Sequence, residues 1–288
     1  MPTRQYETAR QRQTHVTKEV QLKRPSLLLI DAGNTNVKFG LAGADGAIEA
    51  YSLPSAQLST ADALGLSVDG LCRHAGLDPR DLSAWVISSV VPRLDPLLRA
   101  AAGRFCGCPA LFVPEDVPLP LENRYQKPSE VGADRLVAAY GAVRLHPAPG
   151  HVVIDFGTAT TVDCVTAGAY LGGLICPGLL SSAQALSGGT AKLPQADFRV
   201  EGEELDLGTS TAKSLNHGLV FGFAAMVEGL TARLLPRLPA GSTVVATGGF
   251  AEVVAKVCPA IRTVRPDLML EGLRLAYLDN PAFAPREE

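Results

Sequence analysis

The stretch from Ser26 to Leu41, SLLLIDAGNTNVKFGL, constrains the fold of this chain more than any other. It opens with the apolar run Leu27 to Ile30, typical of a buried strand, and the run leads into a carboxylate, Asp31. Gly33-Asn34-Thr35 favours a tight turn, because Gly and Asn tolerate a positive φ and Thr can bond its own backbone. The alternation from Val37 to Leu41 predicts a half-buried second strand. The tip of such a hairpin suits phosphate oxygens or a hydrated metal ion.

Alone, this pattern is equally typical of an ordinary hairpin with a surface aspartate, but the chain contains the pattern twice. Val152 to Val165, VVIDFGTATTVDCV, again runs from an apolar strand through an acid, Asp155, to a Gly-Thr turn and a second strand. A third stretch, Val244 to Gly249, is a short strand that ends in a glycine pair. Two D-x-G hairpins with a threonine in the turn and a late T-G-G turn resemble the nucleotide site of the actin, Hsp70 and sugar-kinase superfamily. The resemblance implies an α/β fold in which two similar mixed-sheet (RNase H-like) domains face each other across an ATP cleft.

Composition narrows the class of protein. Of the 288 residues, 47% are hydrophobic and 19% are charged, which is typical of a globular protein with a sizeable core. The net charge of −3 gives no indication of a nucleic-acid surface. No continuous apolar run approaches the roughly 18 residues of a membrane span, so we expect no membrane contact. The six cysteines form no C-x-x-C pair, which favours reduced thiols and a cytoplasmic protein.

The order of the segments predicts a division of the chain into three parts. Residues 1–24 are polar without an apolar core, and we expect a disordered extension. The first actin-like domain is expected over residues 25–148 and the second over 149–288. A helix is predicted over 129–146 with Ser129 as its cap, and another over 214–235. The long connection 193–207 is expected to be a surface or lid loop.

Other nucleotide-binding motifs are absent from the sequence. There is no G-x-x-x-x-G-K-[ST], and no two glycines lie two positions apart, which excludes G-x-G-x-x-G. Asp155-Phe156-Gly157 spells D-F-G, but no H-R-D precedes it, so it does not indicate a protein kinase.

A possible acid–base group lies between the two hairpins, in Val131 to Arg135, VGADR. Here Asp134 falls in the first turn of the predicted helix, where the helix dipole favours an ionised carboxylate. The alternative is an acid at a helix start that pairs with the neighbouring Arg135 on the surface. The position between the hairpins favours a role at the cleft.

The ordered set of motifs is similar to that of the type III pantothenate kinases and covers nearly all of the chain from Leu27 to Leu278. The similarity rests on D-x-G-N-T from Asp31, I-S-S-V-V-P from Ile87, E-V-G-A-D-R from Glu130, D-F-G-T-A-T-T from Asp155, Y-L-G-G-x-I-x-P-G-L from Tyr170 and A-T-G-G from Ala246. It implies ATP-dependent phosphorylation of pantothenate to 4'-phosphopantothenate, the first step of coenzyme A biosynthesis, with Mg²⁺ accompanying ATP, in a homodimer.

The resemblance also implies roles for individual residues. Asp134 corresponds to the general base, and Asp155 to the ligand of a monovalent cation, K⁺ or NH₄⁺. ATP phosphates would be bound by Asp31, Ala32, Gly33, Asn34, Thr35, Asn36, Val37, Lys38 and Thr158. Pantothenate would be contacted by Tyr125, Gly132, Ala133, Asp134, Arg135 and Thr211. The chain departs from the family at Lys127, where Asn is usual, and at Thr209-Ser210, which replaces Lys-Asn.

Two rival functions remain open from the sequence. They are a non-enzymatic relative, of the kind linked to transcription of virulence genes, and an Hsp70-like ATPase module. A small-residue stripe on the predicted long helix, Gly218, Gly222, Ala225 and Gly229, is consistent with a dimer interface or with packing on the chain's own sheet.

Overall fold

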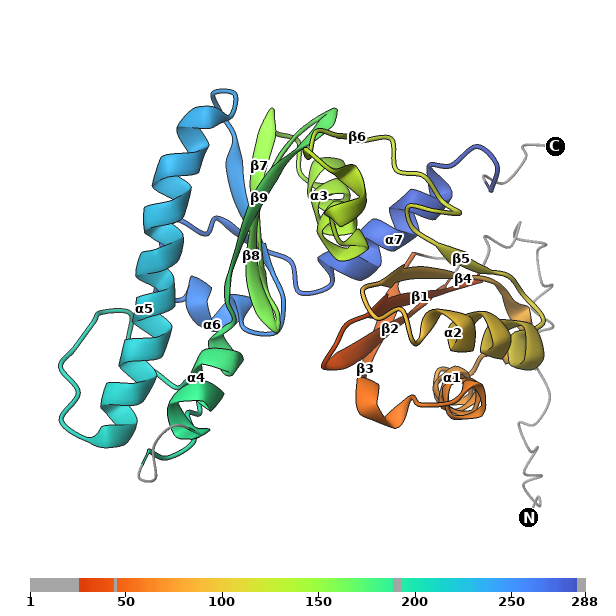
Figure 1. The fold of residues 1–288 in the computed structure, drawn as a ribbon, viewed down its shortest axis with the longest axis horizontal. Helices are drawn as coiled ribbons and strands as arrows, with labels where there is room; N and C mark the ends of the chain where they lie inside the picture. The colour runs from red at the N-terminus through yellow and green to blue at the C-terminus, as the bar shows by residue number, and fades with distance from the viewer. Residues whose placement is uncertain (1–25, 44–45, 189–192, 284–288) are drawn as a thin grey trace, which may run out of the picture.

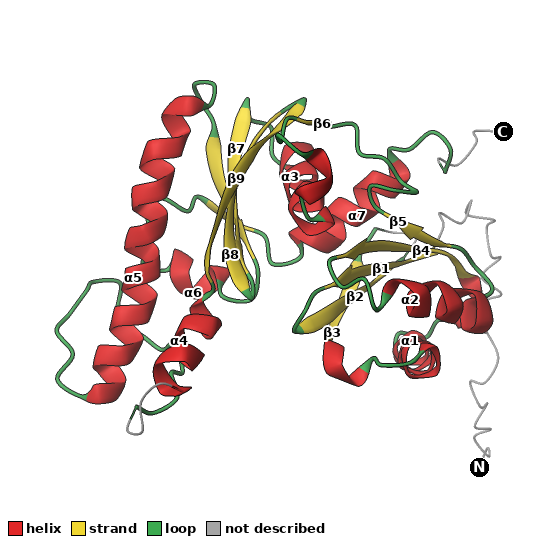
Figure 2. Ribbon diagram, in the orientation of Figure 1, coloured by secondary structure: helices red, strands yellow, loops and turns green. Residues whose placement is uncertain are grey.

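The computed structural model describes residues 26–43, 46–188 and 193–283, and the extension expected at residues 1–24 lies outside them. The described chain contains two mixed sheets with helices on the outer face of each and two helices between them (Figures 1 and 2). This arrangement confirms the predicted α/β architecture of two facing halves.

The first sheet has the strand order β3-β2-β1-β4-β5. Its β1–β2 and β2–β3 pairs are antiparallel, whereas the β1–β4 and β4–β5 pairs are parallel. The strands are β1 (Ser26–Ala32), β2 (Asn36–Ala42), β3 (Ile48–Pro54), β4 (Leu82–Ser89) and β5 (Ala110–Phe112).

The second sheet, of order β11-β10-β7-β8-β9-β6, repeats this topology. Read from β9 to β11, it again has two antiparallel pairs followed by two parallel pairs, and β6 is added at the edge beside β9. The strands are β6 (Glu122–Asn123), β7 (Gly150–Phe156), β8 (Ala159–Thr166), β9 (Ala169–Pro177), β10 (Thr243–Thr247) and β11 (Thr263–Val264). The two hairpins of the sequence are therefore equivalent strands, β1–β2 and β7–β8, of a duplicated unit.

The helices form three layers around the sheets (Figure 1). Each central strand is buried on both faces because its apolar side chains alternate between an outer core and the core between the sheets. The outer helices of the first sheet are α1 (Ala61–His74) and α2 (Asp95–Ala101). Those of the second sheet are α4 (Leu179–Gly188), α5 (Thr211–Leu234) and α6 (Ala251–Ala255). Between the two sheets lie α3 (Ala133–Leu145) and α7 (Leu268–Leu278).

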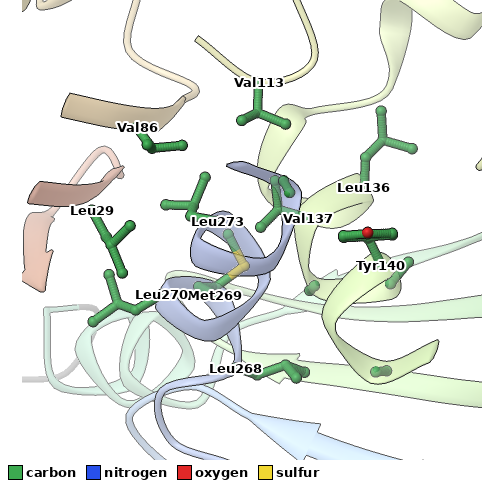
Figure 3. Packing of buried hydrophobic residues seen from close by; sticks show 14 of the residues in the cluster. Leu29, Val86, Val113, Leu136, Val137, Tyr140, Leu268, Met269, Leu270 and Leu273 are labelled. Carbon is green, nitrogen blue, oxygen red and sulfur yellow. The ribbon is translucent and has the colours of Figure 1, made fainter. Parts of the chain in front are cut away.

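The central layer depends on close contact between α3 and α7. Figure 3 shows Leu270 and Leu273 of α7 facing Leu29 of the first sheet, with Val137 of α3 on their other side. A Cβ at Gly272 would lie 2.6 Å from the backbone oxygen of Val137, so a side chain there would separate the helices. The absence of a side chain lets α3 and α7 meet backbone to backbone.

Three segments cross the expected boundary between residues 148 and 149, since α3 packs on β7 and β8 of the second sheet. Strand β6 belongs to the second sheet, and α7 packs on β1 and β4 of the first. The two halves are thus joined by exchanged elements as well as by the chain itself.

The start of α3 differs from the prediction. The helix begins at Ala133 with Gly132 as its N-cap, whereas Ser129 lies in a separate 3₁₀ turn, Pro128–Glu130. Val131 between them is extended, with φ −83° and ψ 123°, which ends the turn before the helix starts. Asp134 nevertheless remains in the first turn of α3.

Helix α5 is long and apolar enough to cross a membrane by length and composition alone, which the sequence analysis did not anticipate. One such helix is weak support for a span, and here Val220, Phe223 and Val227 pack against the second sheet. The connection before it, residues 193–210, is a loop as expected, and Asn216 of α5 accepts a hydrogen bond from the Phe198 N–H at 3.2 Å.

Candidate functional site

The tips of the two hairpins meet. Asp31 and Asp155 are each the penultimate residue of their strand, β1 and β7. Beyond them, the hydroxyl oxygens of Thr35 and Thr158 lie 2.9 Å apart and share a hydrogen bond. The structure therefore brings together the two stretches that the sequence analysis assigned to ATP phosphates.

Not every residue of the first hairpin presents its side chain at this site. The side chains of Ala32 and Val37 are fully buried in the core beside α1 and α2, so only their backbone groups are available to a ligand. The turn between them is held by a Gly33 N–H bond to the Asn36 oxygen, at 3.1 Å, and by the Ser55 hydroxyl, which donates to the Gly33 oxygen at 2.6 Å.

The second hairpin is enclosed by two glycine turns that the sequence motifs contain. A Cβ at Gly178 would lie 2.0 Å from the backbone oxygen of Thr158. Gly248, in T-G-G, has φ +91°, and a Cβ there would lie 2.3 Å from Oδ1 of Asp155. Both positions need glycine because the backbone approaches the hairpin too closely for a side chain.

Asp134, at the start of α3, lies near enough to the hairpins for its charge to act on Asp31 and Asp155. Its Oδ1 accepts the Arg135 N–H at 2.8 Å, and a Cβ at Gly132 would come within 2.4 Å of that oxygen. Burial raises the pKa of Asp134 despite the opposing backbone hydrogen bond, so the carboxylate is harder to ionise than the helix dipole alone would make it.

The three carboxylates of the cleft act on one another electrostatically. Burial raises the pKa of Asp31 to about 7, and the charges of Asp155 and Asp134 add to the rise. Burial also raises the pKa of Asp155 to about 6, although the nearby Lys38 ammonium opposes the shift. Each group therefore lies in a site where negative charge is already in excess.

This excess of negative charge fits cationic ligands. Among the described residues, neither Asp31 nor Asp155 has a hydrogen-bond or ion-pair partner for its carboxylate. Carboxylate oxygens suit Mg²⁺ and monovalent cations. Within the part of the chain that the structure describes, however, no three His, Cys, Asp or Glu side chains converge to hold a metal ion, so phosphate and water oxygens would have to supply further ligands.

Arg135 is not the surface partner of Asp134 that the alternative interpretation required. It is only 7% exposed, and its Nε and Nη2 donate to Oδ1 of Asp163 at 3.0 and 2.6 Å. The Tyr125 ring centroid lies 6.5 Å from that of Tyr170, and the Arg135 guanidinium carbon lies 5.9 Å from the Tyr170 ring centroid. The structure thus groups Tyr125, Arg135 and the start of α3.

The sequence analysis did not identify Asp163. The signal that could have found it is an acid within the apolar strand Val162-Asp163-Cys164, since a buried charge requires a partner.

Thr211 lies apart from the other residues expected to contact pantothenate. It starts α5, which covers the outer face of the second sheet, whereas Tyr125 and α3 lie on the other side of that sheet (Figure 1). Ser210 caps the helix by accepting the Lys213 N–H at 3.2 Å, which gives the unusual Thr209-Ser210 pair a structural role. Lys127, the other departure, forms an exposed ion pair with Glu130 at 2.9 Å.

Comparison with known proteins agrees with this geometry. The sequence model of the family described as Type III pantothenate kinase matches residues 27–233. A type III pantothenate kinase of Nitratidesulfovibrio vulgaris (strain DSM 19637 / Miyazaki F) is 56% identical over 256 residues, which cover 88% of this chain and 98% of the relative. A type III pantothenate kinase of Lawsonia intracellularis is 45% identical, with 88% and 95% covered.

Solved structures share the fold at low identity. A Campylobacter jejuni protein described as a Baf family transcriptional activator superposes with a TM-score of 0.58 at 20% identity, covering 88% of this chain and 99% of that one. A ROK family glucokinase of Streptomyces griseus, solved with glucose and AMPPNP, has a TM-score of 0.50 at 15% identity, with 86% and 97% covered. These likenesses concern the fold alone.

The raised pKa of Asp31 predicts a pH-dependent gain in stability when its charge is removed. The pKa of Asp31 is about 7 in the folded state, whereas the ordinary pKa of an aspartate is 3.8. The contribution of Asp31 to the free energy of unfolding is therefore fully present below about pH 3.8 and is lost as the pH rises through 7. We expect Asp31→Asn to raise the Tm of the ligand-free protein at pH 8 and to have a much smaller effect near pH 4.

Thermal melts at both pH values measure this difference. Asp81→Asn, which removes an exposed carboxylate of the same half, is the control and should show little change at either pH. A lower Tm for Asp31→Asn at pH 8 would contradict the electrostatic explanation.

Proposed function

The chain belongs to the type III pantothenate kinase family, and we propose that the cleft between its hairpins and α3 carries out the reaction with Asp134 as general base. The reaction is the ATP-dependent phosphorylation of pantothenate, the first step of coenzyme A biosynthesis. The observation that carries the assignment of residues is the mutual electrostatic effect of Asp31, Asp155 and Asp134, which come from three distant stretches of sequence.

The two hairpins are proposed to hold the phosphates of ATP. Backbone N–H groups of Asn34 and Thr35, the Lys38 ammonium and the Thr35 and Thr158 hydroxyls supply donors for phosphate oxygens. Bound phosphates would replace the hydrogen bond that the two hydroxyls now share. Mg²⁺ bound with ATP would neutralise phosphate charge beside Asp31.

Asp134 is proposed to orient the attacking primary hydroxyl of pantothenate and accept its proton. Phosphoryl transfer passes through a loose transition state, so the proton leaves late and the base need not be strong. Burial of Asp134 raises its pKa and thereby improves it as an acceptor. Tyr125, Arg135 and the backbone of Gly132 and Ala133 are proposed to bind the rest of pantothenate.

Two rival functions can be tested by one assay. A non-enzymatic relative would release no ADP, and an Hsp70-like ATPase would release ADP without pantothenate. The filled acid positions and the high identity to pantothenate kinases favour pantothenate-dependent release of ADP. We place this reaction in the cytoplasm, without nucleic acid or membrane as partners.

A homodimer is proposed because the small-residue stripe of α5 has no packing partner among the residues that the structure describes. A Cβ at Gly218 or Gly222 would meet nothing within 4 Å, and both residues are exposed together with Ala225. The stripe therefore does not pack on its own sheet. Since Thr211 starts the same helix and lies outside its own chain's cleft, we propose that it contacts pantothenate bound by the second copy.

Activity should depend on a monovalent cation held by Asp155. The carboxylate of this half-buried residue is without a hydrogen-bond or ion-pair partner among the described residues, and a larger cation such as K⁺ or NH₄⁺ is the expected ligand. We expect much lower turnover in buffers that contain only sodium. Asp155→Asn should lose the difference between potassium and sodium, and full wild-type activity in sodium would contradict the assignment.

Gly222→Leu should disrupt the dimer. The leucine side chain would stand where the helix of the second copy approaches, and light scattering should show a shift from dimer to monomer. Gly70→Leu in α1, another helical glycine whose Cβ would meet nothing within 4 Å, is the control and should leave the assembly unchanged. A monomeric wild type at micromolar concentration would end the proposal.

Asp134→Asn should reduce kcat far more than it changes KM. General-base contributions are typically about 10²- to 10⁴-fold, so we expect a loss of that order with the fold intact. The amide keeps the size of the side chain but removes its charge and basicity. Steady-state kinetics measure the effect, with Asp134→Ala as companion. Near-wild-type turnover in a folded Asn variant would place the base elsewhere.

A further inference from the structure

Asp163 is an acid whose position no proposed catalytic role explains. It lies in β8, is 1% exposed, and faces α3 rather than solvent. Arg135 binds it through two nitrogens, and the Tyr170 hydroxyl donates to the same Oδ1 at 2.7 Å. Three donor groups therefore fix one carboxylate beneath the region where pantothenate is proposed to bind.

The packing around this group leaves it little freedom. A Cβ at Gly173 on the neighbouring strand would lie 2.3 Å from Oδ1 of Asp163. The Arg135 guanidinium carbon lies 5.9 Å from the ring centroid of Tyr170. Asp163 binds the Nε and Nη2 side of the guanidinium, and among the described residues Nη1 forms no hydrogen bond.

Stability alone is a poor explanation for such a group. Removing two charges from water is costly, and a buried ion pair can often be replaced by apolar residues without loss of stability. A guanidinium held on one edge, in contrast, is well suited to bind a carboxylate on the other, because both edges present N–H groups in a fixed plane. Pantothenate carries a carboxylate at one end.

We propose that Asp163 is a positioning residue that fixes the Arg135 guanidinium for the carboxylate of pantothenate and thereby sets the preference for an acidic substrate. This inference rests on the proposed contact between Arg135 and pantothenate. Asp163 itself touches neither substrate nor reacting atoms. Its effect is on the orientation of Arg135.

The test compares pantothenate with pantothenol, in which a hydroxymethyl group replaces the carboxylate and the hydroxyl that accepts the phosphoryl group is kept. Wild-type enzyme should have a lower KM for pantothenate than for pantothenol. Asp163→Asn should lose about tenfold or more of that preference, through a higher KM for pantothenate, while kcat/KM for pantothenol changes little. A fold defect would lower activity on both substrates.

The possible results separate the two proposals. Equal KM values in the wild type would refute the Arg135 contact, and the inference with it. A wild-type preference that survives in Asp163→Asn would overturn the role of Asp163 alone. A lower KM for pantothenate in the variant would show that Asp163 merely neutralises Arg135, and this would also overturn the proposal.

Matched variants control for the loss of a buried acid. Asp279 accepts hydrogen bonds from Arg144, at 2.7 and 2.8 Å, and from Tyr140. Like Asp163, it is thus an acid bound by one arginine and one tyrosine, but it joins the ends of α3 and α7 and is not a proposed site residue. Asp279→Asn should leave the substrate preference unchanged. If Asp163→Asn does not fold, Tyr170→Phe carries the test, because it removes one bond to Asp163 and keeps both charges. A several-fold loss of preference is expected there, and an unchanged preference would overturn the proposal.

Discussion

The backbone contact between α3 and α7 is the constraint on which the site depends. Helix α7 packs on the first sheet and α3 on the second, so their contact at Gly272 and Val137 sets how the sheets face each other. The same helix α3 carries Asp134 in its first turn. The position of the proposed base relative to both hairpins is therefore fixed by the core between the sheets and not by a surface loop.

The cleft that this core creates is unfavourable for the ligand-free chain. Three carboxylates lie within reach of one another's charge, and burial adds to the cost of ionising each one. Lys38 offsets the cost only in part. A bound cation would relieve the repulsion. The charges that lower the free energy of unfolding in the ligand-free chain would therefore favour cation binding.

Much of this could be predicted from the sequence because the informative signals are local. An apolar run, an acid and a Gly-Thr turn specify a hairpin, and their second occurrence specifies a duplicated fold. The cap of α3 was predicted wrongly because Pro128 starts a separate 3₁₀ turn within a Ser-Glu stretch that also suits a helix start. The Arg135–Asp163 pair and the place of Thr211 could not be predicted, because they depend on which sheet face each helix covers.

The two halves of the fold differ at one equivalent position, which holds a buried acid in the second sheet and glycine in the first. Gly40 of β2 pairs with Leu29, and Asp163 of β8 pairs with Val153. Gly40 and Asp163 therefore occupy equivalent positions of the two sheets. A Cβ at Gly40 would lie 3.0 Å from the Leu270 side chain of α7, and glycine there lets that helix pack closely. At the equivalent position of the second sheet, α3 presents Arg135 instead of a leucine. The same contact between sheet and helix therefore packs two apolar surfaces together in one half and holds a buried ion pair in the other.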